Sequence, residues 1–259
     1  MALGLPARRI VTDIHVQAGG GVGAARAHFS RPPLPGFEQG VAVLETNTGT
    51  HDMARALAEA TDLIEWSSAA PDVADRMFGR AASFCAAPMT QNDGSHFDQG
   101  IAFWQPNGTF WLQPPGHVHA GFASSWASQT LSAVAVNNSA AQNLPGKPRV
   151  HFIAQRRGDE LVIRAVNPAN FSRPMSVRLR ATGGEMLRAG DAVRLWQLAP
   201  RCGGSGCTAA DLLTTNGPWG GGIAPELSEA KVAVAGQLGL VLPAYSVVIA
   251  RMDLRGGPS

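Results

Sequence analysis

The sequence of 259 residues has little charge, few aromatic side chains and few cysteines. Charged residues make up 15% of it, aromatic residues make up 7%, and there is a single tyrosine. The 21 Lys and Arg residues against 19 Asp and Glu residues give a net charge of +2, and the basic residues are scattered along the chain. A protein that binds nucleic acid through a basic surface is therefore not expected.

Long hydrophobic runs are also absent. No apolar run approaches the roughly 18 residues that cross a bilayer, and Met1 to Pro6 is too short for the apolar region of a signal peptide. We therefore expect no membrane partner. The 30 glycines and 18 prolines predict many turns in a folded chain that is long enough to bury a core.

Three cysteines exclude a full disulfide framework. Cys202 and Cys207 are close enough in sequence for a loop disulfide, although two free thiols are equally compatible with this spacing. A structural zinc site needs four ligands, and no second cysteine pair exists. Three N-x-S/T sequons, at Asn107, Asn137 and Asn170, favour a secreted protein.

The first half alternates strand-like and helix-like patterns, which predicts β/α units. The expected strands are 10–16, 41–44 and 100–104. The expected helices begin at a cap on Thr50 and run to about Trp66, cover about 72–86, and run from Pro115 to about Trp126.

From about Thr130 the hydrophobic period changes to two, which indicates an antiparallel β-sandwich. The expected strands are 130–137, 150–155, 161–167, 175–179, 192–198, 232–235 and 245–252. The predicted fold class is therefore α/β plus all-β. A partial (β/α) barrel of about three units in residues 1–128 precedes a sandwich in residues 129–259.

Two polar residues follow buried strands at the end where β/α folds place catalytic groups. Glu45 ends the run Val43-Leu44, and His15 ends the first strand, with Asp13 two residues before it. These residues are candidates for a site at one face of the β/α array. Alternatively, Glu45 is a polar strand terminus and His15 is a structural histidine with satisfied hydrogen bonds.

Trp104 and Gln105 end the third expected strand, and Asn107 follows. An aromatic ring there could stack on a sugar while the two amides bind its hydroxyls. Equally, Trp104 could lie at the rim of the core.

The histidines do not form a metal-binding motif. His117 and His119 point about 200° apart on a helix, so they cannot chelate one ion together. His51 and His96 lie in expected loops, and Asp98 precedes a strand, where a structural role is expected. We expect neither a metal nor a cofactor.

Several segments, in order, resemble the C-terminal half of α-L-arabinofuranosidases of glycoside hydrolase family 51. They are Asp13-Ile14-His15, Val43-Leu44-Glu45, the block 97–103, Pro114-Pro115 before a helix with Phe122 and Trp126, the strand 161–167, and the segment 242–248.

The resemblance implies a (β/α)8 barrel joined to a β-sandwich, and retaining hydrolysis of terminal α-L-arabinofuranosides. Glu45 matches the nucleophile of the family, and His15 matches a histidine that lines its site. The family's acid/base is a glutamate after an asparagine, several strands before that histidine, but no Asn-Glu pair occurs in this sequence. The family's tyrosine after the histidine is also replaced, by Val16 and Gln17.

The sequence therefore predicts a glycoside hydrolase-like protein that acts on an arabinose-containing polysaccharide or oligosaccharide. In it Glu45 is the nucleophile, and His15, Trp104, Gln105 and Asn107 bind substrate. Because this chain lacks the acid/base, we expect weak activity from it alone, and either a missing N-terminal half of the barrel or a homo-oligomer as partner. The alternatives are a non-catalytic carbohydrate-binding or accessory protein and a metal-dependent hydrolase.

Overall fold

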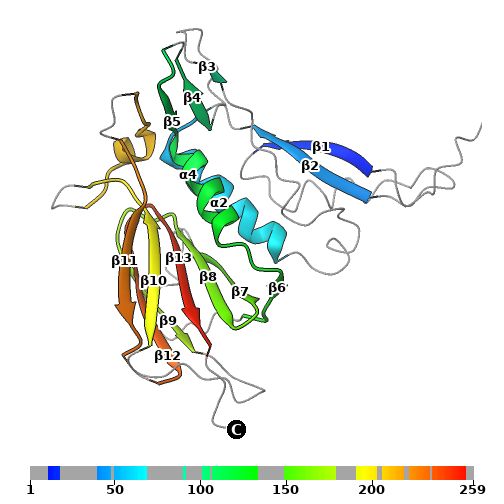
Figure 1. Ribbon diagram of the computed structural model, residues 1–259. Coiled ribbons are helices and arrows are strands. Elements are labelled where there is room, and N and C mark those ends of the chain that lie inside the picture. Colours follow the sequence, from blue (N-terminus) through cyan, green and yellow to red (C-terminus); the bar gives the residue numbers. More distant parts are fainter. Residues whose placement is uncertain are drawn as a thin grey trace, which may run out of the picture.

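The computed structural model describes residues 11–17, 40–47, 50–68, 90–91, 101–105, 107–133, 149–178, 191–202, 206–218, 222–233 and 235–254. For 11–17, 40–47, 90–91 and Trp104 the description is limited to the backbone. This part of the chain is mostly sheet, with few helices. Figure 1 shows two helices against a large antiparallel sheet.

The large sheet has six strands in the order β11-β10-β13-β8-β7-β6, and every neighbouring pair is antiparallel. The strands are β6 (Gln129–Thr130), β7 (His151–Arg157), β8 (Glu160–Asn167), β10 (Ala192–Leu198), β11 (Glu226–Lys231) and β13 (Ser246–Asp253). All eight residues of β8 are buried, because other layers cover both of its faces.

One face of the large sheet packs against a small antiparallel sheet of β9 (Arg173–Arg178) and β12 (Gln237–Leu242). Leu161 and Ile163 of β8 share a core with Leu238 and Leu240 of β12. Met175 and Val177 are the apolar members of the alternation predicted for β9, and both pack against this core. The second half therefore consists of two antiparallel sheets around a common core, in agreement with its period of two.

The other face of the large sheet is covered by α2 (Met53–Ser67) and α4 (Pro114–Ser124), which contact each other along their lengths. Val162 and Val166 of β8 lie in the same core as residues of both helices. Between them Arg164 is buried, and its guanidinium donates to the Ser125 carbonyl after α4 and to the Gln155 side chain. The described structure thus has three layers: helices, large sheet and small sheet.

The sequence of helix α2 is amphipathic, and the helix begins directly after a polar loop. The N-cap is Asp52, whose carboxylate accepts the backbone N–H of Arg55 at 3.0 Å. The prediction that Thr50 caps this helix is wrong by two residues, because the Thr50 hydroxyl donates to the Asp52 carboxylate instead. A carboxylate is also the better cap, since it favours the positive end of the helix dipole.

Helix α4 begins at Pro114, one residue before the predicted start, and the missing proline N–H costs nothing in a first turn. Two glycines bring this helix close to its neighbours. A Cβ on Gly121 would lie 2.9 Å from the Trp196 ring of β10, and a Cβ on Gly116 would collide with the Ile101 carbonyl oxygen. The predicted helix over 72–86 lies outside the described residues.

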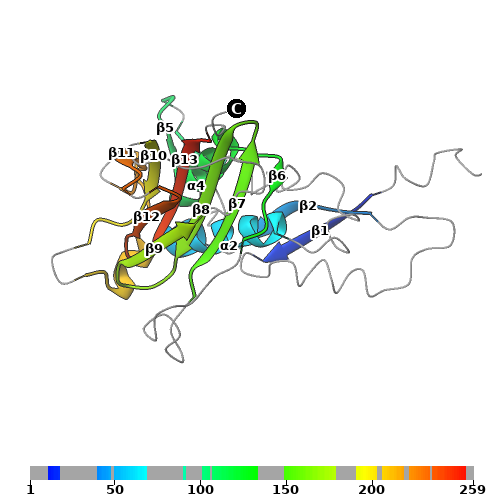
Figure 2. The ribbon, with the colours of Figure 1, turned by 90° about the horizontal axis from the view of Figure 1, so that it is seen from below.

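The remaining strands belong to two small sheets. Strands β1 (Val11–Gln17) and β2 (Gly40–Asn47) form a parallel pair, which lies away from the large sheet in both Figure 1 and Figure 2. Strand β4 (Ala102–Trp104) pairs with β3 (Thr90–Gln91) in parallel and with β5 (Phe110–Leu112) antiparallel. In the described strands β4 is therefore not joined to β1 and β2, and a partial barrel is not confirmed.

Two predicted strands of the second half differ from the structure. The strand expected over 130–137 is limited to β6, because 131–133 lie outside any strand, and 134–137 lie outside the described residues. In the segment 232–235 the described residues 232, 233 and 235 form no strand, because β11 ends at Lys231 and the chain then turns through Gly236, which has φ +72°. The sequence also failed to indicate β11 and β12 themselves. Strand β11 is a polar edge strand, and in β12 the exposed Val241 obscures the alternation of the buried Leu238, Leu240 and Leu242.

Candidate functional site

His15 and Glu45 are brought together by the parallel pairing of β1 and β2. The register makes His15 and Glu45 direct Cα partners, after an irregularity between Asp13 and His15. Both strands continue for two residues beyond these positions, to Gln17 and Asn47. The backbone therefore places the two candidates side by side near the carboxyl ends of adjacent parallel strands.

Trp104, Gln105 and Asn107 occupy a tight hairpin between β4 and β5. The Gln105 N–H donates to the Thr109 carbonyl at 2.8 Å, and the Gly108 N–H donates to the Gln105 carbonyl at 2.9 Å. The exposed Asn107 side chain accepts the Thr109 N–H at 2.9 Å, so this amide stabilises its own turn. These three candidates lie in a different sheet from His15 and Glu45.

The described residues contain no cluster of three or more histidine, cysteine, aspartate or glutamate side chains that could hold a metal ion. Instead, His119 of α4 lies 2.9 Å from Glu59 of α2. His117, two residues earlier, is partly buried, and burial lowers its pKa. His96 and Asp98 lie outside the described residues.

A buried charge cluster joins α2 to α4. The Glu59 carboxylate is fully buried, and it accepts from Arg55 Nε at 2.5 Å and contacts His119 Nε2 at 2.9 Å. Burial raises the pKa of Glu59, but the hydrogen bond and charge of His119, with Arg55, outweigh burial and hold the pKa below its usual value. Both carboxylate oxygens are engaged, so this cluster stabilises the helix pair rather than presenting a group to substrate.

Cys202 and Cys207 form a disulfide, which decides between the two alternatives left open by the sequence. It closes the loop between β10 and η3 (Ala209–Leu213), a short helix that Thr208 and Asp211 cap reciprocally. The Asp211 carboxylate accepts the Thr208 N–H at 2.6 Å and its hydroxyl at 2.8 Å. These backbone and side-chain hydrogen bonds lower the pKa of Asp211.

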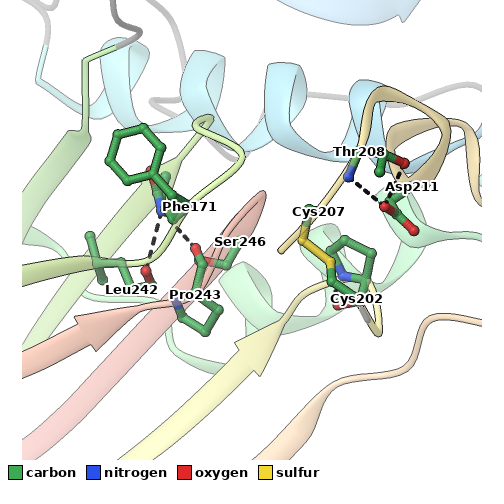
Figure 3. Close-up of a disulfide and its surroundings, with 10 residues drawn as sticks. Phe171, Cys202, Cys207, Thr208, Asp211, Leu242, Pro243 and Ser246 are labelled. Atoms are coloured by element: carbon green, nitrogen blue, oxygen red, sulfur yellow. Dashed lines mark hydrogen bonds between the residues drawn. A yellow bond between two sulfur atoms is a disulfide. The ribbon is translucent and has the colours of Figure 1, made fainter. Parts of the chain in front are cut away.

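A cleft of about 590 Å³ lies beside this disulfide. Three loops line it: the β8–β9 loop, the disulfide loop and the β12–β13 loop. In Figure 3, Phe171 and Pro243 lie on one side and the disulfide lies on the other. The lining residues are Asn170, Phe171, Ser172, Pro200, Cys202, Gly206, Cys207, Pro243 and Ala244.

The buried side chain of Asn167 ties two of these loops together. Its amide donates to the carbonyls of Phe171 at 2.9 Å and Pro243 at 2.7 Å, and its oxygen accepts the Ala169 N–H. Tyr245 adds a further tie, because its N–H donates to the Ala169 carbonyl at 2.8 Å. The sequence assigned no role to either residue, although both lie in segments that carry the family resemblance, 161–167 and 242–248.

Two of the three sequons lie on exposed turns. Asn107 is in the β4–β5 hairpin, and Asn170 is at the rim of the cleft. Asn137 lies outside the described residues. No helix in the described part of the chain has the length and hydropathy that crossing a bilayer requires.

Solved structures of α-L-arabinofuranosidases have a similar fold. The arabinose-bound α-L-arabinofuranosidase MgGH51 matches with a TM-score of 0.61 and 15% identity, over 98% of this chain and 38% of its own. The α-L-arabinofuranosidase of Thermotoga maritima, solved with arabinose, matches with a TM-score of 0.57 and 11% identity, over 94% of this chain and 52% of its own. The fold resembles that of α-L-arabinofuranosidases.

A third match confirms the likeness of fold. It is the family 51 arabinofuranosidase from Xanthomonas axonopodis pv. citri, with a TM-score of 0.55 and 17% identity, over 83% of this chain and 41% of its own. This chain therefore spans about half or less of the length of these structures. No protein-family model matches the sequence, and no curated protein matches it.

Proposed function

We propose that this chain contributes half of the active site of a retaining glycoside hydrolase that acts on terminal α-L-arabinofuranose. The observation that carries the proposal is the register of β1 and β2, which makes His15 and Glu45 direct Cα partners. In this proposal Glu45 attacks the anomeric carbon and forms a glycosyl-enzyme, while His15 binds the sugar or orients Glu45. The likeness of fold to arabinofuranosidases supports the sugar class.

Retention needs a second carboxyl group about 5 Å from the nucleophile, to protonate the leaving oxygen and then activate water. The sequence has no Asn-Glu pair to supply the family's acid/base. General acid catalysis typically contributes about 10²- to 10⁴-fold to the rate. The chain alone is therefore expected to turn over slowly, with the second carboxyl supplied by further barrel strands or by another copy.

Trp104, Gln105 and Asn107 are proposed to bind the sugar beyond the scissile bond. Their hairpin supports this role because it presents an exposed amide at Asn107 and a partly exposed one at Gln105.

We propose the same domain boundary as the sequence indicates, with a partial barrel over 1–128 and a sandwich over 129–259. The disulfide and the two exposed sequons support an oxidising, secretory compartment.

Covalent labelling tests the nucleophile directly. We expect an arabinofuranose-configured epoxide to add one equivalent to the purified chain, and peptide mass spectrometry to locate it on Glu45. Glu45→Gln should abolish labelling, whereas Glu65→Gln, a surface carboxylate of α2 with a side chain 42% exposed, should leave it unchanged. No labelling, combined with no turnover of an aryl α-L-arabinofuranoside, would overturn the proposal.

A second candidate function is non-catalytic carbohydrate binding. The cleft beside the disulfide favours it, because an exposed aromatic ring there lies next to polar side chains. Binding of arabinoxylan that is unchanged by Glu45→Gln, in a chain that is not labelled, would support this alternative.

A further inference from the structure

The cleft beside the disulfide has the properties of a preorganised ligand site. Its volume of about 590 Å³ lies within the range of about 300–1,000 Å³ that is usual for small-molecule sites. Asn167 fixes the loop at Phe171 and the loop at Pro243 through one buried amide. The Ser246 hydroxyl donates to the same Pro243 carbonyl at 2.7 Å, and the disulfide holds the third wall. Because its walls are already ordered, the cleft would lose little conformational entropy on binding.

One wall presents an aromatic face. The Phe171 side chain is 40% exposed although it lines the cleft, which is unusual for a phenylalanine that could have packed in the core. The guanidinium of Arg173 lies 4.9 Å from the ring centroid and is itself buried. This cation–π contact holds the ring in place from one side.

Polar groups stand beside the ring. Asn170 and Ser172, the neighbours of Phe171 on each side, are exposed and line the cleft, and neither side chain has a hydrogen-bond partner in the part of the chain that the structure describes. The Asn170 amide can both donate and accept, as can the Ser172 hydroxyl. Together they match a ligand that carries several hydroxyl groups.

The charge of the cleft narrows the ligand class further. None of the nine lining residues that the structure describes is ionisable at neutral pH, and the Arg173 guanidinium next to the Phe171 ring is buried, so the described lining itself presents no charge to a ligand. A neutral sugar combines an apolar C–H face with hydroxyls at its edge, and this combination fits an exposed ring flanked by an amide and a hydroxyl.

We propose that this cleft is a carbohydrate-binding site that takes one or two neutral sugar residues of an oligosaccharide, with Phe171 as the stacking platform. In Figures 1 and 2, η3 and the disulfide loop next to it lie on the opposite side of the helix pair from β1 and β2. The site is therefore separate from Glu45 and His15, and it does not depend on the proposed hydrolase activity. Such a site would hold a polymer on the protein surface.

Calorimetric titration with neutral oligosaccharides tests the proposal. The full chain is produced in the oxidising periplasm of a bacterial host, so that the disulfide forms and Asn170 carries no glycan, and is titrated with α-1,5-arabinohexaose, xylohexaose and cellohexaose. We expect at least one of them to bind, with a Kd raised about tenfold or more by Phe171→Ala. The matched control Leu227→Ala removes an exposed apolar side chain, 79% exposed, from β11 and should leave the Kd unchanged.

Two further variants separate the possible outcomes. Asn170→Ala combined with Ser172→Ala changes only exposed polar side chains and should also weaken binding, which keeps the test valid if Phe171→Ala fails to fold. Glu45→Gln should leave the Kd unchanged, which separates this site from the proposed active site. The proposal is overturned if none of the three oligosaccharides binds, or if Phe171→Ala and the double variant bind as tightly as the wild type.

Discussion

The Glu59 carboxylate lies out of contact with solvent between two basic side chains, and its removal tests how the helix pair is held. Glu59→Gln would withdraw the counter-charge that Glu59 supplies to the buried Arg55 guanidinium, at 2.5 Å. We expect a loss of about 3 kcal/mol in the free energy of unfolding, because a broken buried ion pair leaves a charge uncompensated. Urea unfolding measures this loss.

A surface carboxylate of the same helix provides the control for this variant. Glu65 is 3.7 Å from His151, and both side chains are more than one-third exposed. Glu65→Gln should change the free energy of unfolding by less than about 0.5 kcal/mol. An equal loss in the two variants would contradict the buried role of Glu59.

The lowered pKa of Glu59 also predicts how stability depends on pH. The unfolded state takes up a proton near the ordinary pKa of 4.5, whereas the folded state takes it up only at lower pH. The contribution of Glu59 is therefore complete above pH 4.5 and is lost as the pH falls through the folded pKa. Unfolding free energies at pH 7, 5 and 3 should show the gap between wild type and Glu59→Gln narrowing below pH 4.5, and a constant gap would contradict this.

Single residues could be predicted from the sequence only where their neighbours in sequence determine their place. His15 and Glu45 follow apolar β-strand runs, so their positions near strand ends are visible in the sequence, and the parallel register makes them partners. Asn167 is different, because its partners at Pro243 and Phe171 are set by tertiary contacts. The sequence also could not decide between Thr50 and Asp52 as the helix cap, because either side chain can accept a backbone N–H of the first turn.

At the scale of the helix, α4 depends on close approach to its neighbours. Gly116→Ala would normally favour a helix, since alanine is about 1 kcal/mol better than glycine in a helix interior. Here the new Cβ would collide with the backbone carbonyl of Ile101, which cannot rotate away. We expect a net loss of about 1–3 kcal/mol in urea unfolding. In Gly239→Ala nothing lies within 4 Å of the added Cβ, so that variant should show no such loss.

The disulfide stabilises the loop between β10 and η3. The two cysteines are five residues apart, and closing so short a loop in the unfolded chain corresponds to about 2 kcal/mol. We expect a double variant, Cys202→Ser with Cys207→Ser, to melt at a lower temperature than the wild type and to be insensitive to reductant. The wild type should approach the melting temperature of the variant when dithiothreitol is added. Equal sensitivity of both proteins to the reductant would contradict this assignment.

Helices and strands could be predicted where apolar and polar residues alternate or where apolar runs are long. Strand β10 has the predicted bounds, and α2 ends within one residue of its expected end. Strand β11 was missed because it lies at the edge of the sheet, where its side chains are largely exposed and no apolar alternation is needed. Hydrophobic periodicity reports burial, so an edge strand leaves little signal.

At the scale of the whole molecule, one core joins the two predicted domains. Met53 and Leu57 of α2 and Phe122 of α4 pack with Val162 of β8 and Ile249 of β13. The division at residues 128 and 129 stays a prediction, and it can be tested by comparing residues 129–259 with residues 50–259.

We expect the shorter of these two chains to melt at a lower temperature and to bind the dye ANS, because the apolar face of the large sheet would be uncovered. Thermal unfolding and dye fluorescence measure both effects. The boundary after residue 128 is compatible with a sandwich that depends on α2 and α4 for cover, and equal melting temperatures without dye binding would contradict that dependence.

The fold as a whole was partly predictable. The change of period near Thr130 correctly indicated antiparallel sheets, and the resemblance to arabinofuranosidases agrees with the similar solved structures. The partial barrel is a different case. Apolar runs identify buried strands but do not say which strands pair, and β4 pairs with β3 and β5 in the described structure rather than with β2.

Tyr245, the single tyrosine of the sequence, has a φ of +47° and is the only non-glycine residue of the described part with a positive φ. A left-handed backbone at a residue with a Cβ costs on the order of 1 kcal/mol, and the surrounding structure must compensate for it. The compensation comes from the buried ring and from the hydrogen bond to Ala169. The strained residue directly follows Pro243 and Ala244, which line the cleft, so the packed core holds this wall of the cleft in a backbone conformation that the free chain would leave.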